Sequence, residues 1–213
     1  MGLAALKKAW MNTALYRKKE SAINEKARNR LTNDGFTILS SNCIGGIIYH
    51  RLGKEFLSPT INLHLSNPDF VNFCVHLDEY LQEELQFIKT EKNHPVAVLS
   101  PHGLPSITIF FNHAHTEEDA HSDWTRRKAR IHRDNLFLIL YNLDGITLEE
   151  LHQLETVPCR NKVVFSAVPL PEISWSCCIK PNHRKNGMCY IDRDLWGVRT
   201  FEKHFDYVTW LNT

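Results

Sequence analysis

The chain has 213 residues, of which 43% are hydrophobic and 23% charged, and its formal net charge is +1 at pH 7. Its length suits one domain, or one domain with an appendage, and its composition is ordinary for a globular protein. The small net charge gives no global field for nucleic acid, and no stretch approaches the roughly 18 apolar residues of a membrane-spanning helix. We therefore expect neither nucleic-acid binding nor a membrane span.

Residues 3–31 are typical of a helix, since Ala, Leu, Lys, Arg and Glu dominate and Leu6, Trp10 and Ala14 recur at helical spacing. We favour a helix that packs on the rest of the chain or on a second copy in a homo-oligomer. The alternative is that its basic face lies on an anionic membrane surface. The short apolar stretch precedes the positive charges, the wrong order for a secretory signal. We expect a cytoplasmic protein, with any membrane contact peripheral and at the inner face.

Strands and helices alternate after this helical extension, which we assign to residues 1–32; residues 33–213 are expected to form one α/β domain. We predict strands over residues 36–41, 60–65, 95–99, 106–112, 135–141, 162–166 and 173–180, and helical regions over 45–52, 67–91, 116–133, 147–154 and 200–211. The pair 95–99 and 106–112 is joined by a short link and forms an antiparallel part. The alternation predicts a three-layer, Rossmann-like α/β fold with a mixed, mostly parallel sheet.

The segment 36–46, Phe-Thr-Ile-Leu-Ser-Ser-Asn-Cys-Ile-Gly-Gly, reads as a strand, a tight turn and the start of a helix. In α/β proteins such a turn lies at the carboxyl end of a strand, where reactive groups gather. Ser41 and Gly45 are small enough to flank a nucleophile in a tight turn. Cys43 is therefore the first candidate nucleophile.

The neighbours of Cys43 support this interpretation. Gly46 leaves the helix N-terminus open, and that terminus is expected to lower the pKa of the thiol. Asn42 offers an amide donor to a developing oxyanion. The alternative is that Cys43 is a small buried apolar residue and that Gly45 and Gly46 merely let the helix pack closely on the sheet.

Two histidines, His113 and His115, follow the predicted strand 106–112 at the same end of the sheet. They would point the same way if that strand persisted so far, and either is a candidate general base for a thiol or a sugar hydroxyl. A metal site would need His121 or Asp144 to complete the pair. Because the chain lacks ligands at a diagnostic spacing, we predict no metal; ordinary surface histidines are the alternative.

The helix predicted over 116–133 carries a basic face. Trp124, Arg127 and Lys128 lie at i, i+3 and i+4 and so share one side of the helix, and Arg130 broadly continues it. Turned toward the site, the guanidinium groups would bind a phosphate or diphosphate. Turned toward water, they would form a solvated face balanced by acidic residues at the start of the helix, and the residues alone do not separate the two arrangements.

These motifs, taken in order, resemble the bacterial exopolysaccharide biosynthesis protein family, a family of unknown function. Its members carry a strand of the type Phe-Thr-Ile-Ile-Ser-Asn-Asn-Cys-x-Gly-Gly, then Ser-Pro-Thr-x-x-Leu, Phe-x-His, and Trp-x-x-Arg-x-x-Arg-Ile before a strand opened by Asn. The matching positions here are 36–46, 58–63, 111–113 and 124–131, with Asn135 opening the strand. Ser41 departs from the usual Asn, and Ile44 stands where an aromatic residue is common.

The resemblance implies a role in making capsules, exopolysaccharides and related surface glycans. It leads us to expect a transferase that acts on a sugar or a lipid-linked glycan acceptor. An acyltransferase that O-acetylates a sugar hydroxyl fits the residues best: Cys43 would take an acyl group from a thioester such as acyl-CoA, and His113 or His115 would deprotonate the acceptor.

The same resemblance gives a set of residues expected to bind the substrate or a phosphate-bearing donor. They are Ser41, Asn42, Gly45, Gly46, Trp124, Arg127, Arg130 and Asn135. Two other functions stay open. One is a glycosyltransferase that holds a nucleotide diphosphate sugar with the basic cluster, and the other is a non-catalytic subunit of a glycan-assembly complex in which Cys43 is inert.

Overall fold

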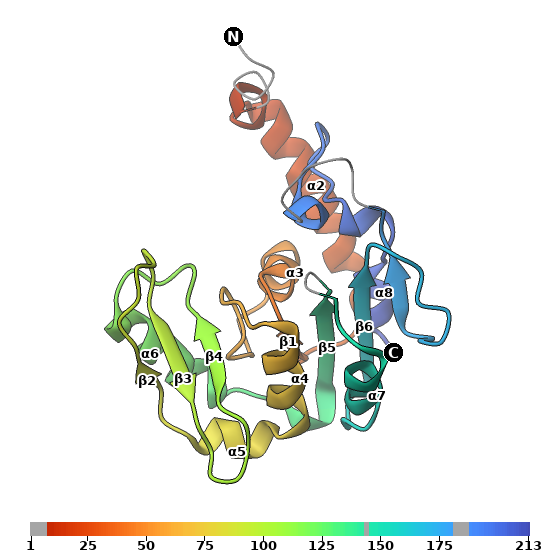
Figure 1. Cartoon of the computed structure of the whole chain (residues 1–213). Helices are drawn as coiled ribbons and strands as arrows, with labels where there is room; N and C mark the ends of the chain where they lie inside the picture. The colour runs from red at the N-terminus through yellow and green to blue at the C-terminus, as the bar shows by residue number, and fades with distance from the viewer. Residues whose placement is uncertain (1–7, 143–144, 181–187) are drawn as a thin grey trace.

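The fold of the computed structural model, which describes residues 8–142, 145–180 and 188–213, is built around two sheets (Figure 1). Sheet A has the strand order β1-β5-β6-β7, and each neighbouring pair is parallel. Its strands are β1 (Thr37–Ser40), β5 (Leu136–Tyr141), β6 (Asn161–Ser166) and β7 (Ser176–Cys178). Sheet B is antiparallel in the order β2-β3-β4, with β2 (Gln86–Phe87), β3 (Val96–Leu99) and β4 (Ile107–Phe110).

Helices cover both faces of sheet A and also pack against sheet B. They are α2 (Ala14–Arg30), α3 (Ile44–Leu52), α4 (Asn67–Val75), α5 (Leu77–Gln82), α6 (Glu117–Lys128), α7 (Leu148–Glu155) and α8 (Tyr207–Leu211), with short 3-10 turns η1 (Arg133–Asn135), η2 (Met188–Ile191) and η3 (Phe201–Lys203). None of the helices within the described ranges has the length and apolar character needed to cross a membrane. The expected α/β class with mostly parallel strands is confirmed, and the antiparallel part forms a sheet of its own. The Rossmann-like arrangement and the boundary at residue 32 stay predictions.

Sheet A separates two hydrophobic cores, because its strands are apolar on both faces as expected for parallel strands covered by helices. All six residues of β5 are buried. Alternate residues belong to opposite cores: Leu136, Leu138 and Leu140 to the first, and Phe137, Ile139 and Tyr141 to the second. The first core includes residues of α4, α6, α7 and sheet B, and the second includes residues of α2, α3, η3 and α8.

The strand expected over residues 60–65 is not a regular strand, and the prediction was wrong there. Asn62 has a φ of 62°, in the left-handed region that interrupts an extended chain. The segment still lies between the two sheets. On one side the Thr60 side chain accepts a bond of 2.8 Å from the Ser40 N–H of β1, and on the other His64 forms an antiparallel bridge with Phe110 of β4.

Three predicted helical regions are interrupted, and at two of the breaks a side chain caps the helix that follows. Residues 8–11 are helical, the chain then turns, and Thr13 caps α2 by accepting from the Tyr16 N–H; residues 3–7 of the predicted helix lie outside the described ranges. The region 67–91 breaks at His76 and ends at Gln82. The last helix, expected over 200–211, splits into η3 and α8, and Asp206 caps α8 through the N–H groups of its first turn.

Arg51, in the last turn of α3, is 2% exposed and ties the second core together. Its Nε and Nη2 bond both carboxylate oxygens of Glu202, at 2.9 and 3.0 Å. Its Nη1 donates to Glu20 and Asn24 of α2, at 3.1 and 3.0 Å, and Nη2 also donates to the Gly197 carbonyl. All five guanidinium N–H groups are therefore used, and one side chain joins α3, α2 and the C-terminal region.

We predict that Arg51→Ala lowers the free energy of unfolding by about 3–5 kcal/mol, because the buried carboxylate of Glu202 loses its bidentate partner and Glu20 keeps only its pair with Arg193. Urea unfolding followed by circular dichroism measures the change. The matched control is Arg133→Ala, which removes a largely exposed pair with Asp78 and should cost less than about 1 kcal/mol. Equal losses in the two variants would show that the Arg51 network does not hold the fold.

Candidate functional site

Cys43 lies at the carboxyl edge of sheet A, in the turn between β1 and α3. Ser41 fixes this turn to β5: its N–H donates to the Ile139 carbonyl at 3.1 Å, and its Oγ accepts from the Tyr141 N–H at 3.0 Å. Ser41 is buried, so the structure places it as the anchor of the turn rather than in the open part of the site.

Asn42 also shapes the turn. Its Oδ1 accepts a bond of 3.0 Å from the Ile44 N–H at the start of α3, and Cys43 is the N-cap residue of that helix. The side-chain carbonyl of Asn42 is thus engaged, which leaves the NH₂ group as its donor. The N–H groups in the first turn of α3 have no carbonyl one turn earlier in the helix. Because the Ile44 N–H is used by Asn42, the N–H groups of Gly45 and Gly46 are the candidate oxyanion donors that α3 offers next to Cys43.

The two glycines allow α3 to approach its neighbours closely. A Cβ at Gly45 would lie 3.0 Å from the Cβ of Ser40, and a Cβ at Gly46 would lie 3.0 Å from Oδ1 of Asn62. Both distances are tighter than ordinary van der Waals contact. The packing role considered for these glycines is therefore present, and it also sets how near the helix N-terminus comes to β1.

The Cys43 sulfur lies 3.3 Å from Nε2 of His113. The strand β4 ends at Phe110, so it does not persist to the histidines, and the condition for His113 and His115 to point the same way is not met. A turn follows instead, with the Ala114 N–H donating to the Phe111 carbonyl. It brings His113 to Cys43, while His115 lines a separate surface pocket with residues 88–90 and 92–95.

Burial raises the pKa of the Cys43 thiol, and the positive charge of Arg199 opposes this effect. The expectation that the helix terminus would leave the thiol with a lowered pKa is therefore wrong in direction. The Nη1 of Arg199 donates to the carbonyl of Ile191, a residue near Cys43. Burial, together with the charges of Arg193 and Arg51, lowers the pKa of Arg199 to about 10.

A cavity of about 220 Å³ opens beside Cys43. Its lining residues come from five separate parts of the chain: Asn42, Cys43, Leu63, His64, Asn112, Tyr141, Tyr190 and Ile191. The rings of Tyr141 and Tyr190 meet edge to face, with centroids 4.6 Å apart. Aromatic and aliphatic groups make most of the wall, and Asn42, His64 and Asn112 contribute its polar groups.

Several of these lining residues were not among the predicted site residues. Tyr141 ends β5, so the rule that placed Cys43 at the carboxyl edge of a parallel sheet would also have found it. Asn112 adjoins His113 and follows β4. Tyr190 and Ile191 come from η2, and no motif in the sequence points to them.

The basic helix face does not reach this cavity. Trp124 is 2% exposed and belongs to the first core. Arg127 is 8% exposed; its Nη1 donates to the Ile61 carbonyl at 3.0 Å and its Nη2 to Asp123 at 2.6 Å. Arg130 forms an ion pair with Glu55. Arg127 and Arg130 line a different pocket, together with Lys54, Glu55, Phe56 and Arg126.

Asn135 lies at the opposite end of sheet A from Cys43, because it immediately precedes β5. Its Nδ2 donates to Oδ1 of Asn33 at 2.8 Å and to the Asp34 carbonyl at 2.9 Å. These bonds join the start of β5 to the turn before β1. The structure thus gives Asn135 a place in the packing of the two strands, apart from the cavity.

No cluster of three or more His, Cys, Asp or Glu side chains that suits a metal ion occurs in the described parts of the chain. His121, one ligand considered for such a site, lies 3.6 Å from a carboxylate oxygen of Glu84. Asp144, the other, lies outside the described residues.

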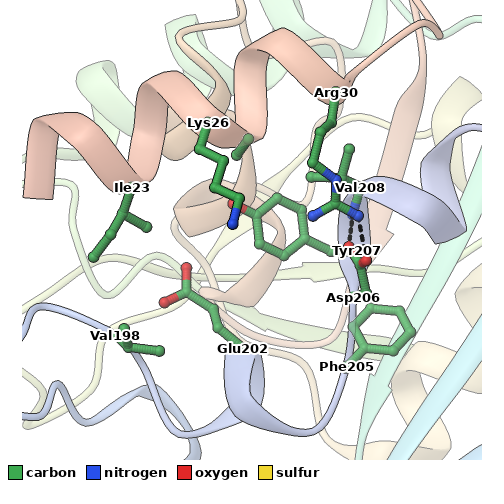
Figure 2. Close-up of a pocket in the computed structure, with 10 residues that line it drawn as sticks. Ile23, Lys26, Arg30, Val198, Glu202, Phe205, Asp206, Tyr207 and Val208 are labelled. Atoms are coloured by element: carbon green, nitrogen blue, oxygen red, sulfur yellow. Dashed lines mark hydrogen bonds and ion pairs between the residues drawn. The ribbon is translucent and has the colours of Figure 1, made fainter.

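A second cleft, of about 380 Å³, lies between α2 and the C-terminal region. Figure 2 shows Lys26 and Glu202 directed into it, and the ion pair between Arg30 and Asp206 at one side. Burial raises the pKa of Tyr207, which lines this cleft, to about 12. None of the lining side chains is a thiol or an imidazole, and Cys43 therefore remains the centre of the candidate site.

Comparison with known proteins extends over nearly the whole chain. A family model described as "Domain of unknown function (DUF1919)" matches residues 15–212. A protein of Haemophilus influenzae, described as an uncharacterized protein, is 34% identical over 203 residues, which cover 95% of this chain and 96% of that protein. Both sheets and every segment that lines the Cys43 cavity fall within the matched region. The chain belongs to the DUF1919 family.

Proposed function

We propose that this protein is a cysteine-dependent acyltransferase that modifies a sugar hydroxyl during the synthesis of bacterial surface polysaccharide. One observation carries the chemistry: the Cys43 sulfur lies 3.3 Å from Nε2 of His113, beside a largely apolar cavity. The polysaccharide context rests on the resemblance of the sequence motifs.

The first half-reaction takes an acyl group from a thioester donor such as acyl-CoA. His113 accepts the thiol proton as the Cys43 sulfur attacks the donor carbonyl. The new bond from carbon to Cys43 sulfur replaces the bond from carbon to the donor sulfur, and the donor leaves as a thiol after taking the proton from His113. In this scheme the NH₂ group of Asn42 and the N–H groups of Gly45 and Gly46 stabilise the oxyanion.

The second half-reaction passes the acyl group to the acceptor. His113, neutral again, removes the proton of a sugar hydroxyl, and the hydroxyl oxygen attacks the acyl carbon. The bond from carbon to Cys43 sulfur then breaks, and the proton held on His113 returns to that sulfur. The balance is one ester formed and one thioester consumed, with no oxidant or metal required.

The cavity favours a short acyl group over a nucleotide. At about 220 Å³ it is smaller than the roughly 300–1,000 Å³ of pockets that enclose drug-sized ligands. Leu63, Ile191 and the two tyrosine rings offer apolar contacts to an acyl chain. Any larger part of the donor or acceptor would lie outside the cavity.

Glycosyl transfer draws less support from the same geometry. The basic residues that would hold a nucleotide diphosphate already have partners. Arg127 is buried and donates to the Ile61 carbonyl and to Asp123, and Arg130 forms an ion pair with Glu55. These residues line a pocket separate from that of Cys43. A diphosphate bound there would have to displace existing contacts.

We predict that incubation with acetyl-CoA leaves an acetyl thioester on Cys43, detected by peptide mass spectrometry at mildly acidic pH. Cys43→Ala should abolish the adduct with little change in melting temperature. Cys177→Ala is the matched control, because Cys177 is also half-buried but bonds to the His204 carbonyl away from the cavity. A wild-type protein that never acylates, while a nucleotide sugar and not CoA raises its melting temperature, would instead identify a glycosyltransferase.

Substitutions of His113 and His115 should have different effects on the rate of Cys43 acylation. His113→Gln is expected to lower the rate of Cys43 acylation by about 10²–10⁴-fold, the usual contribution of a general base, because it removes the proton acceptor beside the sulfur. His115→Gln should leave the rate unchanged, since His115 lines another pocket. Stopped-time acylation assays measure both, and equal rates in the two variants would exclude His113 as the base.

The raised pKa of Cys43 predicts the pH dependence of its alkylation. Iodoacetamide reacts with the thiolate, and a raised pKa shifts formation of the thiolate to higher pH. The alkylation rate should therefore be low at neutral pH and still rise where a free cysteine has levelled off. The same peptide in urea-unfolded protein gives the reference curve. A rate that stays constant from neutral to mildly acidic pH would reveal a preformed thiolate paired with an imidazolium instead.

A further inference from the structure

The segment 190–200 turns back toward the start of α2 at one end of the molecule (Figure 1), and exposed apolar side chains of both segments form a patch there. Leu15, Leu195 and Trp196 are 53%, 55% and 57% exposed. They make up half of the six most exposed large hydrophobic residues in the described ranges; the others, Ile88, Leu148 and Val168, are scattered. A clustered apolar surface of this kind marks an interaction site more often than single exposed residues do.

The patch is held in a fixed shape. Asp194 accepts bonds from the N–H groups of Trp196 and Val198, at 2.8 and 3.0 Å, which closes a tight turn with Leu195 and Trp196 at its tip. The indole N–H of Trp10 donates to the Leu195 carbonyl at 2.7 Å and fastens that turn to the helical N-terminal region. These hydrogen bonds hold the turn so that the side chains of Leu195 and Trp196 face solvent.

Cations border the patch. The Lys19 ammonium lies 3.7 Å from the centroid of the Trp196 ring. Leu15, Lys18 and Lys19 share one face of α2, since they lie at i, i+3 and i+4. The acids nearby are already paired: Glu20 with Arg51 and Arg193, and Asp194 with Lys203. The exposed charge beside the apolar tip is therefore positive.

We propose that this patch, formed by Leu15, Lys18, Lys19, Leu195 and Trp196, docks the protein on the anionic surface of a lipid bilayer. Tryptophan and leucine suit the boundary between headgroups and acyl chains, and lysines at its rim suit anionic headgroups. A second copy of the chain is a poorer occupant, because a two-fold contact would bring the same lysines of both copies together. The proposal does not depend on acyl transfer.

Docking would set the orientation of the Cys43 cavity. Tyr190 and Ile191 line that cavity, and Leu195 and Trp196 follow a few residues later in the same segment. The carboxyl edge of sheet A also lies toward this end of the molecule (Figure 1). A protein held by the patch would therefore keep the cavity close to the membrane surface.

The test is sedimentation of the full chain with sucrose-loaded vesicles of phosphatidylcholine alone or mixed with phosphatidylglycerol. We expect binding to the anionic vesicles that weakens as salt is raised. Lys18→Gln and Lys19→Gln should each weaken binding about fivefold, the usual contribution of one lysine near an anionic surface. Trp196→Ser should weaken it about tenfold or more, because a large apolar side chain no longer enters the interface.

Two comparisons keep the result interpretable. Val168→Ser, at a site 59% exposed and outside the patch, should bind as the wild type does. Leu15→Ser alters the patch without touching the 194–198 turn, so it should weaken binding even if Trp196→Ser disturbs that turn. Equal binding to neutral and anionic vesicles, or no vesicle binding by the wild type, overturns the proposal. A concentration-dependent dimer that Trp196→Ser dissolves, seen by light scattering, would assign the patch to a second copy instead.

Discussion

The buried guanidinium of Arg51 is the contact on which the second core depends. It lies between two carboxylates, Glu20 and Glu202, beside the aromatic and aliphatic side chains of the second core, and Arg193 pairs with Glu20 as well. A buried ion pair of this kind stabilises little by itself but specifies geometry, because each partner would be costly to leave alone. Here it fixes α3 against α2 and against the C-terminal region. The position of α3 in turn fixes the turn that carries Cys43.

Much of this could be predicted from the sequence, where local pattern and topology agree. Apolar runs located β1, β5 and β6, the strand expected over residues 173–180 contains the shorter β7, and small residues around Cys43 located a tight turn at a strand end. The rule that carboxyl ends of parallel strands share one edge then brought Cys43 into the candidate site. His113 was also found, although it reaches the sulfur from a turn after β4 and not from an extended strand. The place of His113 just after a predicted strand was therefore informative, although the backbone there is a turn and not an extended strand.

Other features depended on contacts that no local pattern encodes. Arg127 has the spacing of an exposed basic face, yet its guanidinium is buried and donates to the Ile61 carbonyl and to Asp123. Segment 60–65 has strand composition, but a left-handed residue and a side-chain bond to β1 replace the ladder. Tyr190 and Ile191 reach the cavity from a region with no motif. The pKa of Cys43 followed burial rather than the helix terminus, because desolvation depends on what the whole fold packs around the sulfur.

The strand order of sheet A has a consequence for how the protein is made. Within the described sheet β1 pairs with β5, so Thr37 finds its partner Leu136 only after more than half of the chain has been synthesised. Until then the first strand has an open edge, and the thiol that follows it lacks the walls supplied by Tyr141 and Tyr190. Pairings so distant in sequence slow folding, because loop-closure entropy is lost before the contacts form. The turn that carries Cys43 therefore emerges early from the ribosome and is among the last parts of the chain to be enclosed.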